Sequence, residues 1–273
     1  MSLSRLPLFP LICRALVALS MTIAPCVQAD EAGMQLAQKV FDRPDGKDAT
    51  SLLTMSLIEP GRSPRVRKLV TYQMRRKPGE SAALTRFTEP ADIAGTGLLT
   101  QDHLNADTDQ WIYLPALDRV RRISASRKGG RFVNSEIYYE DLRERKPTQD
   151  THRIIGREAI NGINCDILES IPVDPSNSVY LKRVSWIDPS TLLPLQADFY
   201  EKNLQEPSKR LQVKKHGKVQ AYWTVLDSVV TDLSSGNQTR LTTGKIIYDR
   251  RLPAKLFTTQ ALEDEGLEEE FRP

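Results

Sequence analysis

Hydrophobic and polar residues alternate with a period of two through most of the chain after residue 50. Leu53, Met55 and Leu57 share one side of the first such run. In the second, Val66, Val70, Tyr72 and Met74 lie opposite Arg67, Thr71, Gln73 and Arg75. This period predicts β-strands with one buried face. Further strand candidates, bounded by Pro, Gly or Asp-rich turns, are 84–88, 97–101, 110–114, 179–187, 195–200, 208–214, 221–231 and 238–248.

The clearest predicted hairpin joins residues 153–160 to residues 163–171 through Asn161 and Gly162. Asn-Gly favours a two-residue type I′ turn, because both residues tolerate positive φ angles. Two stretches show helical spacing instead. Residues 31–42 predict a short amphipathic helix that Pro44 and Gly46 terminate. Residues 134–145 predict a short helix or a lid that crosses the sheet.

Ten to twelve strand candidates at this spacing predict one antiparallel sheet system. No Pro, Gly and Ser-rich linker divides the sequence, and we find no repeat of fixed period. We therefore expect a mainly β protein with short helices, forming a single domain over residues 30–273. The acidic stretch 263–270 is interpreted as a solvated end.

The first 29 residues have the composition of a signal peptide. Arg5 and Arg14 accompany an apolar run over residues 15–24, which is too short to span a bilayer. Small residues at the −3 and −1 positions predict cleavage after Ala29 and hence export. The alternatives are a membrane anchor, which the length disfavours, and lipidation at Cys26, which Pro25 disfavours.

Composition and charge exclude several classes of protein. The chain has 273 residues, 40% hydrophobic and 27% charged, which argues against disorder and against a polytopic membrane protein. The formal charge of +3 is too small to indicate a nucleic-acid-binding protein. Removal of residues 1–29 leaves a nearly neutral chain with Cys165 as its single thiol. Cys165 lies in an apolar alternation, so we expect it to be buried and inert.

The sequence contains little that indicates catalysis. There is no Gly-x-Ser-x-Gly motif, no phosphate-binding loop, and no third glycine after Gly95 and Gly97. His103, His152 and His216 have no second His or Cys at metal-ligand spacing. We therefore expect no enzyme activity, no cofactor and no metal.

A basic cluster stands out in this otherwise balanced chain. Six cationic residues fall within thirteen positions, namely Arg119, Arg121, Arg122, Arg127, Lys128 and Arg131. One interpretation is a strand with a solvated face followed by a basic loop. The other is a patch that contacts anionic phospholipid head groups or an acidic partner.

Several ordered motifs resemble a known family. They are Trp111-Ile112-Tyr113-Leu114-Pro115 with Arg121-Arg122-Ile123, then Tyr139-Glu140-Asp141-Leu142, then Trp186-Ile187-Asp188 with Leu193-Pro194-Leu195, and finally Phe199-Tyr200. Together these motifs resemble the outer membrane lipoprotein-sorting protein family, which is related in fold to the LolA/LolB-like periplasmic lipoprotein carriers. The similarity extends from about Leu52 to Tyr248.

The resemblance implies an incomplete antiparallel β-barrel around a hydrophobic cavity with a helical lid, located in the periplasm. It implies a carrier for a lipid or an acylated protein, working with an inner-membrane transporter of the resistance-nodulation-division (RND) type in transport to the outer membrane. Peripheral membrane contact is compatible with this role. The alternative is a non-carrier adaptor of such a transporter that docks through residues 119–131. The candidate cavity residues are Leu53, Met55, Leu57, Val70, Tyr72, Met74, Trp111, Tyr113, Ile163, Ile167, Leu195 and Phe199.

Overall fold

The computed structural model describes Met1, residues 30–77 and residues 79–273, so the expected signal peptide and its cleavage site lie almost entirely outside the described residues. Strands dominate the described part. They are β1 (Asp48–Ile58), β2 (Arg65–Lys77), β3 (Glu80–Glu89), β4 (Gly97–Asp102), β5 (Asp109–Leu114), β6 (Arg119–Arg122), β7 (Asp150–Ile160), β8 (Ile163–Pro172), β9 (Lys182–Ile187), β10 (Pro194–Tyr200), β11 (Lys209–Val219), β12 (Tyr222–Asp232) and β13 (Gln238–Tyr248). The α-helices are α1 (Glu31–Phe41) and α2 (Thr259–Glu263).

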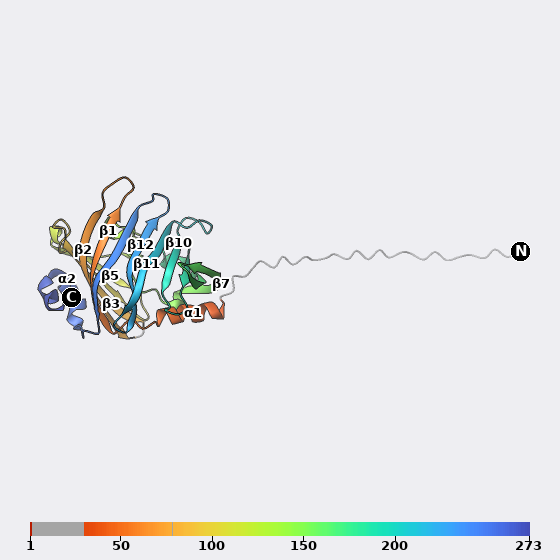
Figure 1. The fold of residues 1–273 in the computed structure, drawn as a ribbon, viewed down its shortest axis with the longest axis horizontal. Helices are drawn as coiled ribbons and strands as arrows, with labels where there is room; N and C mark the ends of the chain where they lie inside the picture. Colours follow the sequence, from red (N-terminus) through yellow and green to blue (C-terminus); the bar gives the residue numbers. More distant parts are fainter. Residues whose placement is uncertain (2–29, 78) are drawn as a thin grey trace.

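All thirteen strands form one antiparallel sheet in the order β6-β5-β4-β3-β2-β1-β13-β12-β11-β10-β9-β8-β7. The first and the last strand are neighbours at the centre of the sheet, because β1 pairs with β13 on one side and with β2 on the other. The sheet curves strongly, and its edge strands β6 and β7 do not pair with each other (Figure 1). The expected incomplete antiparallel β-barrel is thus confirmed.

The local predictions around the β7–β8 hairpin and α1 are also confirmed. Asn161 and Gly162 have φ angles of 52° and 82°, as a type I′ turn requires. The side chain of Asp30 caps α1 by accepting a hydrogen bond from the amide of Ala32 at 3.0 Å. The helix lies directly against β7, because a Cβ atom added at Gly33 would come within 2.7 Å of the backbone of His152.

Residues 132–145, here called the lid segment, cross the concave face of the sheet. They contain short 3-10 turns, η3 (Phe132–Asn134) and η4 (Glu140–Leu142), where the helical spacing had allowed a helix. Positive φ angles of 47° at Val133 and 61° at Asn134 prevent a continuous helix. The lid expected from the same spacing is present, since Phe132 and Ile137 are buried with strand residues such as Met55 and Leu69.

The convex face of β2 to β6 is covered by residues 252–271, here called the C-terminal segment, which contain α2 and flanking 3-10 turns (Figure 1). Leu256, Phe257 and Leu262 are fully buried there against Tyr72 and Leu84. The interpretation of residues 263–270 as a solvated end holds only in part, because most of them are exposed but Leu267 is half-buried and Glu268 is fully buried. The acidic composition of this stretch gives no indication that one side of the C-terminal segment is apolar and packs on the sheet. Only the position of the sheet in the structure shows it.

A buried ion pair lies between the sheet and the C-terminal segment. Arg86 of β3 and Glu268 have no exposed surface, and Nη2 of the arginine donates to Oε1 of the glutamate at 2.7 Å. The same guanidinium donates to the carbonyl oxygens of Gly95 at 2.6 Å, Ala261 at 2.8 Å and Leu262 at 2.9 Å. One arginine thus fixes the C-terminal segment by charge and by backbone hydrogen bonds together.

Three further observations concern chemistry and membranes. Cys165 is fully buried, and burial raises the pKa of its thiol. Within the described residues, no group of three or more His, Cys, Asp or Glu side chains could hold a metal ion. Over the same residues, no helix is both long enough and apolar enough to cross a membrane.

Candidate functional site

A cavity of about 410 Å³ lies between the concave face of the sheet and the lid segment. Strands β1, β2, β3, β4 and β13 form its floor, and the lid segment covers it. Its apolar lining comes from both sides, and the larger side chains in it include Leu53, Met55, Leu69, Leu98, Leu241, Phe132, Ile137 and Leu142. Most of these side chains also belong to the core on the concave face, so the cavity is continuous with the packed interior.

The cavity changes from apolar to charged along the strands. Residues paired across neighbouring strands lie on the same face of the sheet, so the strand register shows which side chains follow one another along the cavity wall. At one end Leu69 lies opposite Phe87. Two residues further along β2, Thr71 faces Thr85, which in turn faces Leu98. At the other end the strands present three polar side chains to the cavity, namely Arg75, Ser81 and Asp102.

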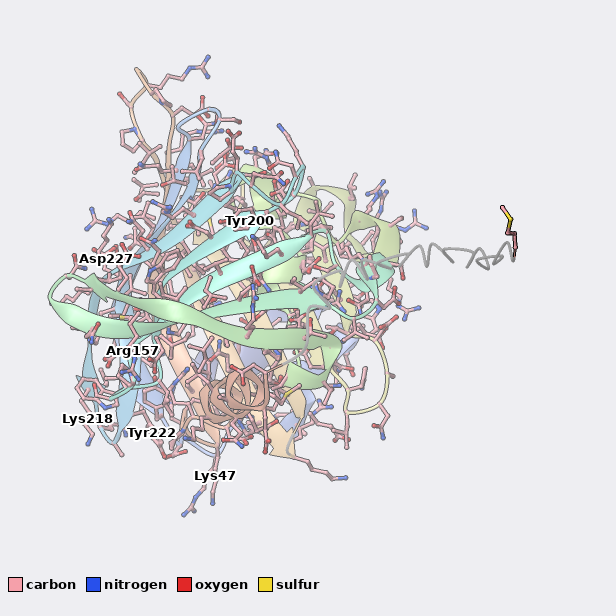
Figure 2. The ribbon with its side chains drawn as sticks, turned by 90° about the vertical axis from the view of Figure 1, so that its right-hand side faces the viewer. Lys47, Arg157, Tyr200, Lys218, Tyr222 and Asp227 are labelled. Carbon is pink, nitrogen blue, oxygen red and sulfur yellow. The ribbon has the colours of Figure 1, made fainter. Side chains whose placement is uncertain are left out.

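The charged end forms the mouth. Nη2 of Arg75 lies 2.8 Å from Oδ2 of Asp45 and 3.4 Å from Oε1 of Glu144. Asp102 accepts hydrogen bonds from Thr108 at 2.6 Å and from Ser81 at 3.1 Å. The mouth opens at the end where β1 begins, where Lys47 projects away from the body of the molecule (Figure 2).

Two buried polar atoms at the mouth have no hydrogen-bond partner. They are Nε of Arg143, a donor, and Oε2 of Glu144, an acceptor, and both side chains belong to the lid segment. Burial raises the pKa of Glu144, and it also raises the pKa of the nearby Asp102. Unpaired buried polar atoms are costly, so they mark a place where a ligand or water completes the site.

The lid segment is held down by a buried lysine. Nζ of Lys209 in β11 lies 2.7 Å from Oδ2 of Asp141, and only 3% of its side chain is exposed. The ammonium group lies 3.7, 4.8 and 5.0 Å from the ring centroids of Tyr138, Tyr180 and Phe199. Tyr180 donates to Oδ1 of Asp141 at 2.6 Å, and burial raises the pKa of its hydroxyl. These contacts combine an ion pair with cation–π attraction.

The residues predicted to line the cavity separate into several groups. Leu53 and Met55 do line it, whereas Met74 borders the cavity but packs with the core cluster under the C-terminal segment. Leu57 lies on the same face in the core, next to a smaller pocket. Phe199 lies in the aromatic cage around Lys209. The remaining strand residues of the second half belong to a separate core cluster on β8 to β12, and these are Ile163, Ile167 and Leu195.

Four of the predicted residues face the other way. Val70, Tyr72, Trp111 and Tyr113 pack on the convex face under the C-terminal segment, so the structure corrects their assignment to the cavity. The alternation had correctly grouped Val70 and Tyr72 on one face of β2. Period two cannot tell which face of a strand is concave, because both faces of this strand are covered.

Sequence reasoning missed most of the residues that do form the cavity. On β2 the cavity face carries Leu69, Thr71, Gln73 and Arg75, three of which belong to the side interpreted as polar. A usable signal was present, because Leu69 interrupts that polar side at the position opposite Leu53. The contributions of Arg143 and Glu144 from the lid segment had no sequence signal of their own.

The six residues of the basic cluster do not form one uniform patch. Arg122 pairs with Asp109, Arg131 pairs with Glu136 and with Asp232, and Lys128 donates to the carbonyl oxygen of Ser176. The other three are exposed, and within the described residues none of them has a carboxylate partner. These three are Arg119, Arg121 and Arg127.

Comparison with known proteins gives consistent neighbours. A family profile described only as an uncharacterized protein matches residues 79–264. A structure described as an outer membrane lipoprotein-sorting protein domain, from Vibrio parahaemolyticus, is 30% identical, with a TM-score of 0.81 over 86% of this chain and 99% of that one. A DUF1329 family protein from Desulfovibrio piger is 31% identical, with a TM-score of 0.80 over 85% and 98% of the two chains.

A more distant neighbour shares the fold. It is a LolA superfamily protein from Nitrosomonas europaea, 18% identical, with a TM-score of 0.65 over 84% of this chain and 98% of that one. No curated protein matches the sequence significantly.

Proposed function

Because the chain belongs to the outer membrane lipoprotein-sorting protein family, we propose that it is a periplasmic carrier that binds a lipid or a lipid-modified protein in the cavity under the lid segment. The observation that carries this proposal is the apolar end of that cavity, which Leu53, Met55, Leu69 and Leu98 line. The neighbours named for lipoprotein sorting and for the LolA superfamily support it.

The energetics of such a site favour acyl chains. Each methylene group buried from water contributes about 0.8 kcal/mol, so eight methylenes would contribute roughly 6 kcal/mol before the entropic cost of association. A carrier also needs a soluble exterior, and the convex face has one where the C-terminal segment covers it. Such a carrier performs no chemical reaction on its cargo.

The location of the protein is part of the same proposal. The basic and apolar N-terminal 29 residues support export across the inner membrane, with cleavage after Ala29. The nearly neutral charge of the remaining chain suits a carrier that must leave the membrane surface again, since strong positive charge would retain it on anionic lipids.

Native mass spectrometry of protein purified from the periplasm under gentle conditions tests the carrier function. We expect a bound lipid, lost in an Ala83→Phe variant, because Ala83 lines the cavity and a phenyl group would fill it. The matched control is Thr242→Phe, which adds the same ring at an exposed position next to Leu241. Absence of lipid from the unaltered protein, even after incubation with membrane lipid extract, would exclude the carrier function.

We also propose a partner, an inner-membrane transporter of the RND type, as the family resemblance implies. A second candidate function is that of an adaptor which docks on this transporter without carrying cargo. The exposed Arg119, Arg121 and Arg127 favour it, because they offer unpaired positive charge on the edge strand β6 and on the turn that follows it.

Charge reversal at these three positions separates the two functions. If docking alone matters, the triple Arg→Glu variant no longer co-purifies with the transporter, and Ala83→Phe retains full activity in transport to the outer membrane. If carriage matters, Ala83→Phe abolishes activity although the partner still co-purifies.

A further inference from the structure

We propose that the cargo is a single-chain amphiphile whose uncharged head group both accepts and donates hydrogen bonds, as a monoacylglycerol does. This inference rests on the proposed carrier function and specifies its ligand. The chain would occupy the apolar end of the cavity, and the head group would lie at the mouth between Arg143 and Glu144.

The length of the cavity fits one extended acyl chain with its head group. From Leu69 to Arg75 the strand β2 advances six residues, which is about 20 Å at the usual rise per residue. One leaflet of a bilayer core is roughly 15 Å thick, half of the usual 30 Å. A chain of leaflet length therefore leaves room for a small head group within the cavity.

The volume and the walls favour one chain over several. The cavity of about 410 Å³ lies near the lower end of the range for small-ligand sites, roughly 300 to 1,000 Å³. Only its inner end is apolar, since Thr71, Thr85 and Thr100 line the middle. Three acyl chains would bring apolar surface against these hydroxyl groups and against the charged mouth. Apolar contact there would bury polar groups without giving them hydrogen bonds, which is unfavourable.

The mouth requires a head group with both kinds of hydrogen-bonding atom. Nε of Arg143 is a buried donor without an acceptor, and Oε2 of Glu144 is a buried acceptor without a donor. An ester carbonyl can satisfy the arginine while a neighbouring hydroxyl satisfies the glutamate. A head group with acceptors only would leave the glutamate oxygen unpaired.

The charges at the mouth disfavour an anionic head group. Carboxylates outnumber cations in the lining, which contains Asp45, Asp48, Asp102, Asp141 and Glu144 against Lys47, Arg75 and Arg143. Asp141 is already paired with Lys209, and Arg75 is already paired with Asp45 and Glu144. A fatty-acid carboxylate at the mouth would add a negative charge to a lining in which carboxylates already outnumber cations, and like charges repel.

The test compares three probes at equal concentration by native mass spectrometry with the purified protein: monoolein, oleate and a tripalmitoylated cysteinyl peptide. We expect one monoolein per chain, binding at least about tenfold tighter than oleate, as the loss of one charged hydrogen bond implies. We expect Arg143→Met to weaken monoolein binding by a similar factor. Glu144→Gln should raise the ratio of oleate to monoolein bound, a readout that a partial loss of folded protein does not change.

Each contrary result has a distinct meaning. Oleate binding as tight as monoolein binding would overturn the uncharged head group. Displacement of monoolein by the tripalmitoylated peptide would overturn the single chain and leave the carrier function standing. Failure of all three probes to bind would overturn this inference, and the carrier function falls with it only if the protein also takes up no lipid from membrane lipid extract.

Discussion

Replacing Glu268 by Gln tests whether the buried ion pair holds the C-terminal segment on the sheet. The amide has nearly the size of the carboxylate, so packing is conserved while the negative charge is lost. Arg86 then keeps its hydrogen bonds to the carbonyl oxygens of Gly95, Ala261 and Leu262, but its charge has no counter-ion. The variant therefore isolates the charge of the pair from its shape.

The expected loss of stability is large because neither partner touches water. Arg86 and Glu268 both have 0% exposed side chains. Removing one partner of such a pair costs about 3 to 5 kcal/mol, a substantial part of the roughly 5 to 15 kcal/mol that stabilises an ordinary protein. The matched control is Glu265→Gln, which breaks a pair with Arg272 whose carboxylate side chain is 45% exposed. That change should cost less than about 1 kcal/mol.

Urea unfolding, followed by circular dichroism and by tryptophan fluorescence, measures both variants. Trp111 packs under the C-terminal segment, whereas Trp186 and Trp223 lie in β9 and β12. With those two replaced by Phe in every variant, the fluorescence of Trp111 reports detachment of the C-terminal segment. Circular dichroism reports the sheet. If Glu268→Gln releases the segment first, the two signals separate; if the segment and the sheet unfold together, both midpoints fall equally.

Equal midpoints for Glu268→Gln and Glu265→Gln would refute the reasoning. A double variant, Arg86→Met with Glu268→Leu, tests the cause of the loss. If an uncompensated charge is responsible, the apolar pair should recover part of the stability. Recovery should be small, because the carbonyl oxygens of Gly95, Ala261 and Leu262 lose their donor and this loss offsets most of the gain.

Three further predictions concern α1, its neighbour on β7, and the lid segment. Gly33→Ala should lower the free energy of unfolding by about 1 to 3 kcal/mol, since its Cβ would lie 2.7 Å from the backbone of His152. The control Gly244→Ala, at an exposed position of the central strand β13, should change it little, and urea midpoints compare the two variants. Burial lowers the pKa of His152, so its contribution to stability is present above about pH 6.5 and is lost as the pH falls below it; urea midpoints at about pH 7.5 and 5.5 should differ less in His152→Asn, and an unchanged difference would contradict this. Asp141→Asn leaves Lys209 buried without a counter-ion and should expose the lid segment to limited proteolysis, with the cleavage sites mapped by mass spectrometry; wild-type resistance would show that the ion pair does not hold the lid.

The strands were predictable because the signals for them are local. Alternation in 238–248 and the Asn161-Gly162 turn depend on neighbours in sequence, and the structure has both where they were expected. The cap at Asp30 and the helix after it are local in the same way. The short strand β6 was present only as one interpretation of the basic cluster, because four residues are too few for a periodic pattern.

The candidate site was predictable only in part. Leu53 and Met55 line the cavity because the first strand has a single strongly apolar face. Tyr72 and Trp111 do not, although they are equally apolar. The unpaired atoms of Arg143 and Glu144 result from packing of the lid segment on strands distant in sequence, which no local pattern records.

The sequence by itself determined the strands, their turns and the grouping of side chains by face. Only the tertiary structure decided which face became the cavity wall. For β2 that decision depends on Leu256 and Phe257, which lie more than 180 positions further along the chain and cover one face, leaving the other to the cavity. Burial is a property of what packs on a surface, and the period of a strand carries no information about a partner so distant in sequence.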